Sequence, residues 1–483
     1  MPLTSTAVSS CNDRQRRQEW RRWLGVVTLG MVVMVVTTTS VVLLNRHATT
    51  PNVLPSATLY VTSAPAGATV LVDGRQRGRT PMQLTVPPGD RRLTFQGSRV
   101  VPATVDVLAV ARQVVEVRGT LWLRTPATEL LRPPFPGASI ATAGFLADGR
   151  VWLTAALPAG DERQLWVRPH DGGLQRLGPA IAPGAIVPSP DGGRVAYLAP
   201  SEIAAAAPSG FAPRLTAVRI ASSDGQHDRQ QFALDPGADD QLTDLSWSTD
   251  GSHLLLVIRR QQKDGGTRTL LRWLDVVQGS APTLEELPSA VVPGRFLWSP
   301  RGDLVAFLTQ AGPLVSLCLL GTAPPSFRYL ADLETNDASP LSFPPVTWSA
   351  DGTRLVYAAP VQDQATTLAG RLFGGRIGSA LFATRMSDPT SRRLGTAEAG
   401  NPVWRADGSL LALARPTRSG PISADAIDAR TGGAMALATL PVPPAAAYSV
   451  AWDATHGQAL LAERTDGGSV AYWLLSFTPG VGR

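Results

Sequence analysis

Four aspartates lie within ten residues of one another and form the densest group of possible metal ligands in the chain. They are Asp235, Asp239, Asp240 and Asp244. Carboxylate oxygens are ligands that Ca²⁺ prefers, but the spacing is not that of an EF-hand loop. The five histidines are scattered, and none has a zinc-site spacing to a cysteine or to another histidine. We therefore predict no metal and no cofactor, and we interpret the aspartates as a solvated acidic loop in which Asp239 and Asp240 are candidate partner contacts.

A second candidate binding segment carries positive charge and an aromatic ring. Residues 361–379 form a long stretch between two apolar runs, and Arg371, Phe373 and Arg376 lie within it. Guanidinium groups bind carboxylates and phosphates well, so the two arginines favour an anionic partner. The alternative is an insertion that binds nothing.

Motifs for covalent or phosphate chemistry are missing from the sequence. No Gly-x-Ser-x-Gly pentapeptide occurs, which excludes the usual nucleophile elbow of a serine hydrolase. No glycine-rich phosphate loop precedes a helical pattern. We therefore predict no catalytic residue and a protein that is not an enzyme.

A short strand–turn–strand pattern organises most of the chain. Its best copy is the segment from Val346 to Tyr357, in which Asp351 and Gly352 supply a tight turn. Seven copies recur, with their glycines 43 to 59 residues apart, and such a period in a strand-rich sequence is typical of propeller blades. The turn glycines are Gly149, Gly192, Gly251, Gly302, Gly352, Gly408 and Gly457.

Each repeat divides into four strands, except that the last repeat lacks the fourth. Residues 128–133 resemble the fourth strands of other repeats, so we predict that they complete the last blade and close the ring. Closure removes exposed strand edges. The fold class is thus all-β with a seven-bladed propeller over residues 128–480; six blades are the alternative.

A tryptophan recurs at one place in the first strand of five repeats. Rings repeated at the same place in each blade are expected to fill the space between blades. A cage of rings around a ligand is the alternative. The five residues are Trp247, Trp298, Trp348, Trp404 and Trp452.

The N-terminal region contains the one continuous apolar run, residues 24–44. As a helix it would be roughly 30 Å long, enough to span a bilayer. Arginines precede the run, so the positive-inside rule predicts that residues 1–23 are cytoplasmic and that the rest lies outside, after a linker at 45–56. A cleaved signal peptide is the alternative.

The sequence pI of about 9.9 raises the question of nucleic acid. Several arginines are topology signals, and no basic helix or aromatic–basic RNA motif occurs, so we predict no nucleic-acid partner. Cys11 and Cys318 would lie on opposite sides of the membrane, which leaves Cys318 as a small core residue.

Residues 57–123 alternate strands and turns and form a small all-β module. The run from Ser63 to Gly97, with Pro65-Ala66-Gly67-Ala68 near its start, resembles a PEGA domain. That resemblance implies a small β-sandwich found outside the membrane in bacterial envelope proteins, without catalytic residues. The repeats Trp-Ser-x-Asp-Gly resemble those of TolB-like propellers, which implies a fold that serves translocation-associated proteins, peptidases and binding modules.

These observations together predict a single-pass bacterial membrane protein that binds or scaffolds a partner outside the cytoplasm without catalysis. The partner would be an envelope protein or an anionic polymer. Because the long loops gather at one end of the blades, we predict binding on the face made by the loops between the second and third strands and between successive blades. The alternatives are a propeller enzyme acting on envelope polymer, and an envelope sensor that works through another protein.

Overall fold

The structure is a computed structural model of the 483-residue chain, and its strands account for nearly all regular structure described. It describes residues 56–157, 162–169, 173–182, 184–201, 214–235, 239–262, 265–311, 314–322, 324–334, 346–361, 378–394, 401–405, 408–414, 422–427, 434–440, 447–464 and 470–478. The smaller of two compact units contains described residues 56–60, 83–91 and 107–117, and the larger contains the others.

The N-terminal module consists of two sheets. The first has the order β4-β1-β7, from β1 (Ala57–Ala64), β4 (Met82–Val86) and β7 (Val114–Thr120). The second has the order β3-β2-β5-β6, from β2 (Thr69–Val72), β3 (Arg75–Arg79), β5 (Gly89–Gly97) and β6 (Val100–Ala109). The turn at Gly67-Ala68 is held by Thr80, whose hydroxyl oxygen accepts both backbone N–H groups at 3.1 Å.

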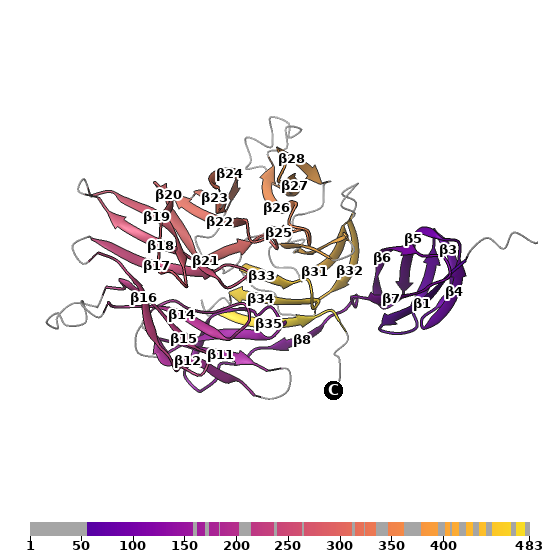
Figure 1. Cartoon of the computed structure of the whole chain (residues 1–483), viewed down its shortest axis with the longest axis horizontal. Coiled ribbons are helices and arrows are strands. Elements are labelled where there is room, and N and C mark those ends of the chain that lie inside the picture. Colours follow the sequence, from indigo (N-terminus) through magenta and orange to yellow (C-terminus); the bar gives the residue numbers. More distant parts are fainter. Residues whose placement is uncertain are drawn as a thin grey trace, which may run out of the picture. The chain divides into compact units, whose positions relative to one another are not determined.

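Seven four-stranded antiparallel sheets follow, in agreement with seven predicted blades (Figure 1). Blade 1 is β9 (Ser139–Phe145), β10 (Val151–Ala156), β11 (Arg163–Arg168) and β12 (Gln175–Ala182). Blade 2 is β13 (Ile186–Pro188), β14 (Arg194–Ala199), β15 (Ala217–Ser222) and β16 (Arg229–Ala233). Blade 3 is β17 (Asp240–Trp247), β18 (His253–Gln261), β19 (Thr267–Asp275) and β20 (Thr283–Leu287).

Blade 4 is β21 (Ala290–Trp298), β22 (Leu304–Ala311), β23 (Leu314–Thr322) and β24 (Pro325–Glu334). Blade 5 is β25 (Val346–Trp348), β26 (Arg354–Val361), β27 (Gly378–Arg385) and β28 (Asp388–Leu394). Blade 6 is β29 (Asn401–Trp404), β30 (Leu410–Ala414), β31 (Ser423–Ile427) and β32 (Ala434–Thr439).

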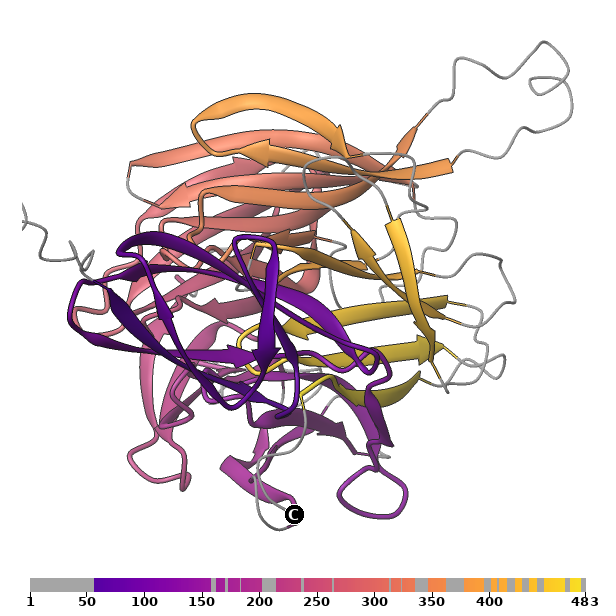
Figure 2. The same ribbon diagram turned by 90° about the vertical axis from the view of Figure 1, so that its right-hand side faces the viewer.

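The last blade is completed by a strand from the start of the propeller, as the sequence predicts. Blade 7 is β33 (Ala447–Asp453), β34 (Gln458–Arg464), β35 (Val470–Ser476) and β8 (Ala127–Leu130). Strand β8 runs antiparallel to β35, with Leu130 opposite Trp473 and Ala127 opposite Ser476, and Figures 1 and 2 show the two strands side by side. The N–H of Leu131 extends this pairing to the Tyr472 carbonyl at 2.8 Å. The early strand therefore ties the two ends of the ring together.

The described core of the propeller consists of apolar clusters between neighbouring blades. Each of the seven junctions between successive blades, including the junction of blades 7 and 1, has its own cluster. Cys318 is buried between blades 3 and 4, which confirms its predicted place in a core. Each blade has apolar residues on both faces of its sheet and buries them against its two neighbours, so its stability depends on both.

No described helix is long and apolar enough to cross a bilayer. Residues 24–44, predicted to span the membrane, lie outside the described part of the chain.

Candidate binding pocket

The Ser-x-Asp-Gly turns between the first and second strands share one hydrogen-bond pattern. In blade 5, the Ser349 hydroxyl donates to Asp351 Oδ1 at 2.6 Å and accepts the Arg354 N–H at 2.9 Å. Asp351 Oδ1 also accepts the Thr353 N–H at 3.0 Å. Gly352 has φ +66°, a left-handed conformation that costs glycine little. The equivalent residues of blades 2 and 3 make the same three bonds.

These hydrogen bonds lower the pKa of the turn aspartates Asp351 and Asp250. The hydrogen bonds from the Ser349 hydroxyl and the Thr353 N–H lower the pKa of Asp351 to about 2, because they stabilise the carboxylate. Burial raises the pKa of Asp250, but the hydrogen bonds from Ser248 and Ser252 outweigh that effect and bring it to about 2. Both carboxylates are therefore ionised at neutral pH and occupied within their own turns.

Successive turns pack on one another around the ring. A Cβ atom placed on Gly352 would lie 2.8 Å from Arg301 of the preceding blade, and one on Gly302 would lie 2.9 Å from Thr249 of the blade before that. A Cβ on Gly149 would lie 2.6 Å from the ring of His456 in blade 7. Glycine is thus needed at these three turns for close approach, whereas a Cβ on Gly408 of blade 6 would meet nothing within 4 Å.

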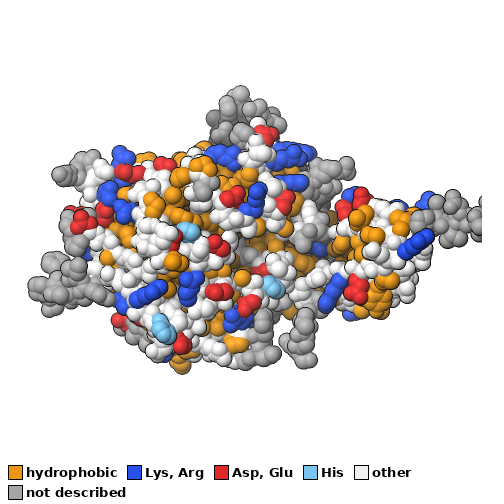
Figure 3. Space-filling model, viewed as in Figure 1, with side chains coloured by type: hydrophobic (Ala, Val, Ile, Leu, Met, Phe, Trp, Pro, Cys, Tyr) orange, Lys and Arg blue, Asp and Glu red, His pale blue; other side chains and the backbone are white. Residues whose placement is uncertain are grey.

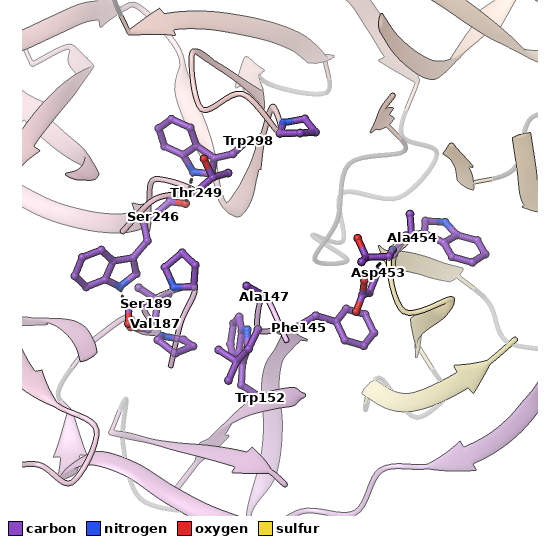
Figure 4. A pocket seen from close by; sticks show the side chains of 17 residues that line it. Phe145, Ala147, Trp152, Val187, Ser189, Ser246, Thr249, Trp298, Asp453 and Ala454 are labelled. Carbon is purple, nitrogen blue, oxygen red and sulfur yellow. Dashed lines mark hydrogen bonds between the residues drawn. The ribbon is translucent and has the colours of Figure 1, made fainter. Parts of the chain in front are cut away.

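The tryptophans join neighbouring blades just below these turns. Trp348 donates its indole N–H to the Leu297 carbonyl at 3.0 Å. Trp298 donates its indole N–H to the Ser246 hydroxyl at 3.0 Å, and Figure 4 shows these two residues. Trp348 and Trp404 are buried between blades. The predicted packing role of these rings is therefore confirmed, while Trp298 and Trp452, which are half-buried, also face a cavity.

A pocket of about 630 Å³ lies inside this ring of turns. Its walls come from the first strands and following turns of blades 1, 2, 3, 4 and 7 and from Trp152 on the second strand of blade 1. The first strands of blades 2, 3 and 4 contact one another in turn, so the pocket lies at one end of the inner strands of the ring. Figure 4 shows labelled side chains from β9, β13, β17, β21 and β33 around the opening. Aromatic rings, prolines and alanines supply most of the wall, and its polar groups are Ser189, Ser246, Thr249, Asp453 and Thr455.

Asp453 is the only carboxylate among the described residues of this wall. Its Oδ1 atom accepts the N–H groups of Thr455 and His456 at 3.1 Å each, and its Oδ2 atom lies 2.7 Å from Nδ1 of His456. The carboxylate is thus engaged by its own turn. An Asp–His pair can serve as an acid–base dyad, but here the imidazole is packed over Gly149.

The two predicted candidate residues that the structure describes, Asp239 and Asp240, lie outside the pocket wall. Asp239 forms an exposed ion pair with Arg214 at 2.7 Å, and Asp240 is buried and paired with Arg260 at 2.8 Å. Asp240 begins β17 whereas Trp247 ends it, so this pair of acids is at the opposite end of the strand from the pocket. The prediction of a solvated acidic loop is wrong for Asp240 and Asp244, because both lie in β17 and are buried. No group of three potential metal ligands occurs among the described residues. Arg371, Phe373 and Arg376 lie outside the described residues, so their predicted role stays a prediction.

Sequence reasoning did not anticipate the pocket. Four of its five aromatic residues were visible as repeats or near repeats, namely Phe145, Trp247, Trp298 and Trp452, whereas Trp152 on β10 belongs to no repeat. The repeat predicts that each ring packs between blades, and it cannot tell which rings also reach the channel. The departure from serine at Asp453 was the one local signal that this turn differs.

Comparisons with known proteins found a family match for the N-terminal module and similar solved structures for the propeller. Residues 56–122 match the PEGA domain family. The PEGA domain is followed by a β-propeller that resembles those of TolB, oligogalacturonate lyase and prolyl endopeptidases. No curated protein matches the chain.

The similar solved structures are distant in sequence. Oligogalacturonate lyase from Vibrio parahaemolyticus has 10% identity and a TM-score of 0.47, and the match covers 73% of this chain and 97% of that one. The propeller domain of the Trilobed protease from Pyrococcus furiosus has 11% identity and a TM-score of 0.41, with 71% and 96% covered. TolB from Acinetobacter baumannii has 13% identity and a TM-score of 0.29, with 71% and 79% covered. Such likeness concerns the fold and leaves function open.

Proposed function

We propose that this protein is a non-catalytic binding protein of the bacterial cell envelope, held by residues 24–44 and exposed outside the cytoplasm. The observation that carries the binding role is the pocket inside the ring of turns. Its volume is that of a binding site, and its wall combines aromatic and aliphatic groups with polar groups, beside turns that pack closely on one another. The bound group is an apolar side chain of an envelope protein, because Asp453 is already occupied and no other described wall residue is charged.

Two further features support this proposal. Basic and acidic side chains are interspersed on the propeller face shown in Figure 3, which favours a partner other than nucleic acid. A glycosidase-like enzyme would need two carboxylates about 5–10 Å apart, and the described wall of the pocket contributes one.

The loop carrying Arg371, Phe373 and Arg376 remains a proposed second contact region at the other end of the blades. An anionic segment of the same partner would suit its arginines. Variants of the pocket and variants of this loop are expected to affect partner capture independently, so both proposals can be tested in one experiment.

The test is cross-linking capture from envelope extract with the full chain and three double variants. Ala147→Arg with Thr455→Arg fills the pocket with two long side chains at exposed wall positions. Thr267→Arg with Thr283→Arg adds the same charge at exposed positions on the outer strands of blade 3. Arg371→Glu with Arg376→Glu reverses the charge of the loop.

We expect the pocket variant to lose at least about tenfold in captured partner, as removal of a buried anchor does, and the blade 3 variant to retain capture. Loss with the loop variant alone would refute the pocket and favour the opposite face. New reducing ends released from envelope polysaccharide by the unaltered chain, and lost with Asp453→Asn, would favour an enzyme instead.

A further inference from the structure

The smaller unit exposes an unusual amount of apolar surface for its size. Of the ten large apolar side chains that are exposed among the described residues, four belong to this unit. They are Tyr60 (43% exposed), Leu108 (60%), Val110 (36%) and Val114 (66%), and we call them the apolar tip. Water-exposed apolar groups gathered in so few residues indicate a surface that is covered in the working protein.

The apolar tip lies where the chain enters the folded module. The N–H of Arg112 donates to the Ser56 carbonyl at 2.8 Å, and the N–H of Thr58 donates to the Gln113 carbonyl at 2.9 Å. The turn between β6 and β7 therefore lies beside the first described residue. Arg112 is exposed on this turn, in a left-handed conformation with φ +61°.

The chain that precedes Ser56 indicates what covers the tip. The apolar run at 24–44 ends only eleven residues before Ser56. Even fully extended, eleven residues span at most about 40 Å. If the run enters a membrane, the tip must stay near the lipid surface.

We propose that the apolar tip seats in the interfacial layer of that membrane. This inference rests on the anchoring part of the proposed function. Tyrosine and aliphatic side chains insert among the headgroups and upper acyl chains, and the Arg112 guanidinium binds lipid phosphates. Glu116 is exposed two residues beyond Val114, and its charge limits the insertion of the apolar tip to a shallow depth in the membrane. The PEGA domain then orients the chain on the membrane instead of hanging freely from its linker.

The test uses the full chain in vesicles of phosphatidylcholine and phosphatidylglycerol containing a spin-labelled quencher lipid. In a Cys11→Ser background, single cysteines carry a fluorophore at Val110→Cys, at Val114→Cys or at Met34→Cys within the apolar run. Val277→Cys is the matched control, because Val277 is 85% exposed in the propeller. Cys318 is 2% exposed and stays unlabelled in the folded protein.

We expect the labels at 34, 110 and 114 to be quenched about twofold or more by the lipid, and the label at 277 to be unaffected. Quenching at 34 without quenching at 110 and 114 would overturn the seated tip and leave the anchor intact. Absence of quenching at 34 would overturn the anchor, and the tip proposal with it. Replacement of Leu108 by Asp should reduce quenching at 110 without changing the melting temperature, because this side chain is 60% exposed.

Discussion

The propeller has a regular side and an irregular side. Blades 2, 3 and 5 keep serine and aspartate in their turns and make the same three hydrogen bonds. Blade 4 has Arg301 in the aspartate position, and Asp303 accepts the Ser299 hydroxyl instead. Blades 6, 7 and 1 replace the serine by Arg405, Asp453 and Leu146.

The departures at the serine position surround the place where the ring is closed, whereas blade 4 keeps its serine and departs only at the aspartate position. Blade 7 contains the joined strands β35 and β8, and blades 6 and 1 are its neighbours. Each replacement makes a contact that serine could not make. Arg405 donates to the Pro102 carbonyl at 3.0 Å, Asp453 holds His456 against the next blade, and Leu146 packs beneath the turn of blade 2.

The comparison distinguishes turns whose side chains bond only within their own hairpin from turns whose side chains contact other parts of the chain. Where a turn needs only to close a hairpin, serine and aspartate satisfy its backbone groups locally. Where the ring is closed or the pocket wall is built, the same position is used for a longer contact.

The closing strand should produce the largest effect. Replacement of Ala127–Leu131 by a segment of the same length rich in glycine and proline removes the pairing with β35 and the buried Leu131. We expect a loss of about 5 kcal/mol in the free energy of unfolding, from the cavity and the lost ladder bonds. Urea unfolding followed by circular dichroism measures this loss.

A matched replacement in β16, Arg229–Ala233, removes the outer strand of a blade on the regular side. The β16 replacement should lower the free energy of unfolding by about half as much as the β8 replacement. It removes hydrogen bonds between strands but leaves the ring closed. Leu131→Ala measures the side-chain part alone. Equal losses in the free energy of unfolding for the β8 and β16 replacements, after subtraction of the Leu131→Ala effect, would show that ring closure adds no stability beyond ordinary strand pairing.

Restoring the repeat at blade 1 should lower stability. Leu146 is buried, and a Cβ on Gly192 of the next blade would lie 3.0 Å from it. Leu146→Ser should therefore cost about 3 kcal/mol, because the lost packing outweighs a new turn hydrogen bond. Thermal unfolding by calorimetry measures the shift, with Ser349→Ala as the opposite change on the regular side. A stabilised Leu146→Ser variant would mean that the irregular turns are degenerate copies without contacts of their own.

Acid should weaken the regular turns, with the smallest effect. The pKa of Asp351 is lowered to about 2 from its ordinary value of 3.8. Its ionised form therefore contributes stability that is complete above pH 4 and is lost as the pH falls toward 2. We expect the stability difference between the unaltered chain and Asp351→Asn to shrink across that window, measured as urea midpoints from pH 6 to pH 2.

The Ser349→Ala background provides the control for this pH dependence. Without the serine donor, the folded pKa of Asp351 should rise toward its ordinary value, so the pH-dependent part of the difference should decrease. A difference that stays constant from pH 6 to pH 2 in both backgrounds would contradict the role of these bonds.

Much of the fold could be predicted from the sequence because its information is local and repeated. The tight turn around Asp351 and Gly352 needs only neighbouring residues, and its recurrence locates the blades. The strand at 128–133 was recognisable from its likeness to other fourth strands. The PEGA segment likewise carries its turn chemistry within one continuous run.

The sequence by itself determined the strand order, the number of repeats and the need for a closing strand, because each follows from short-range patterns. Only the tertiary structure decided which tryptophans stay between blades and which reach the channel, and whether an acid is free or already paired. Asp240 and Asp453 are both aspartates at strand ends, yet one is buried against Arg260 and the other forms a pocket wall. The physical reason is that burial and pairing depend on residues brought from distant blades, and the twist and closure of the ring set those distances.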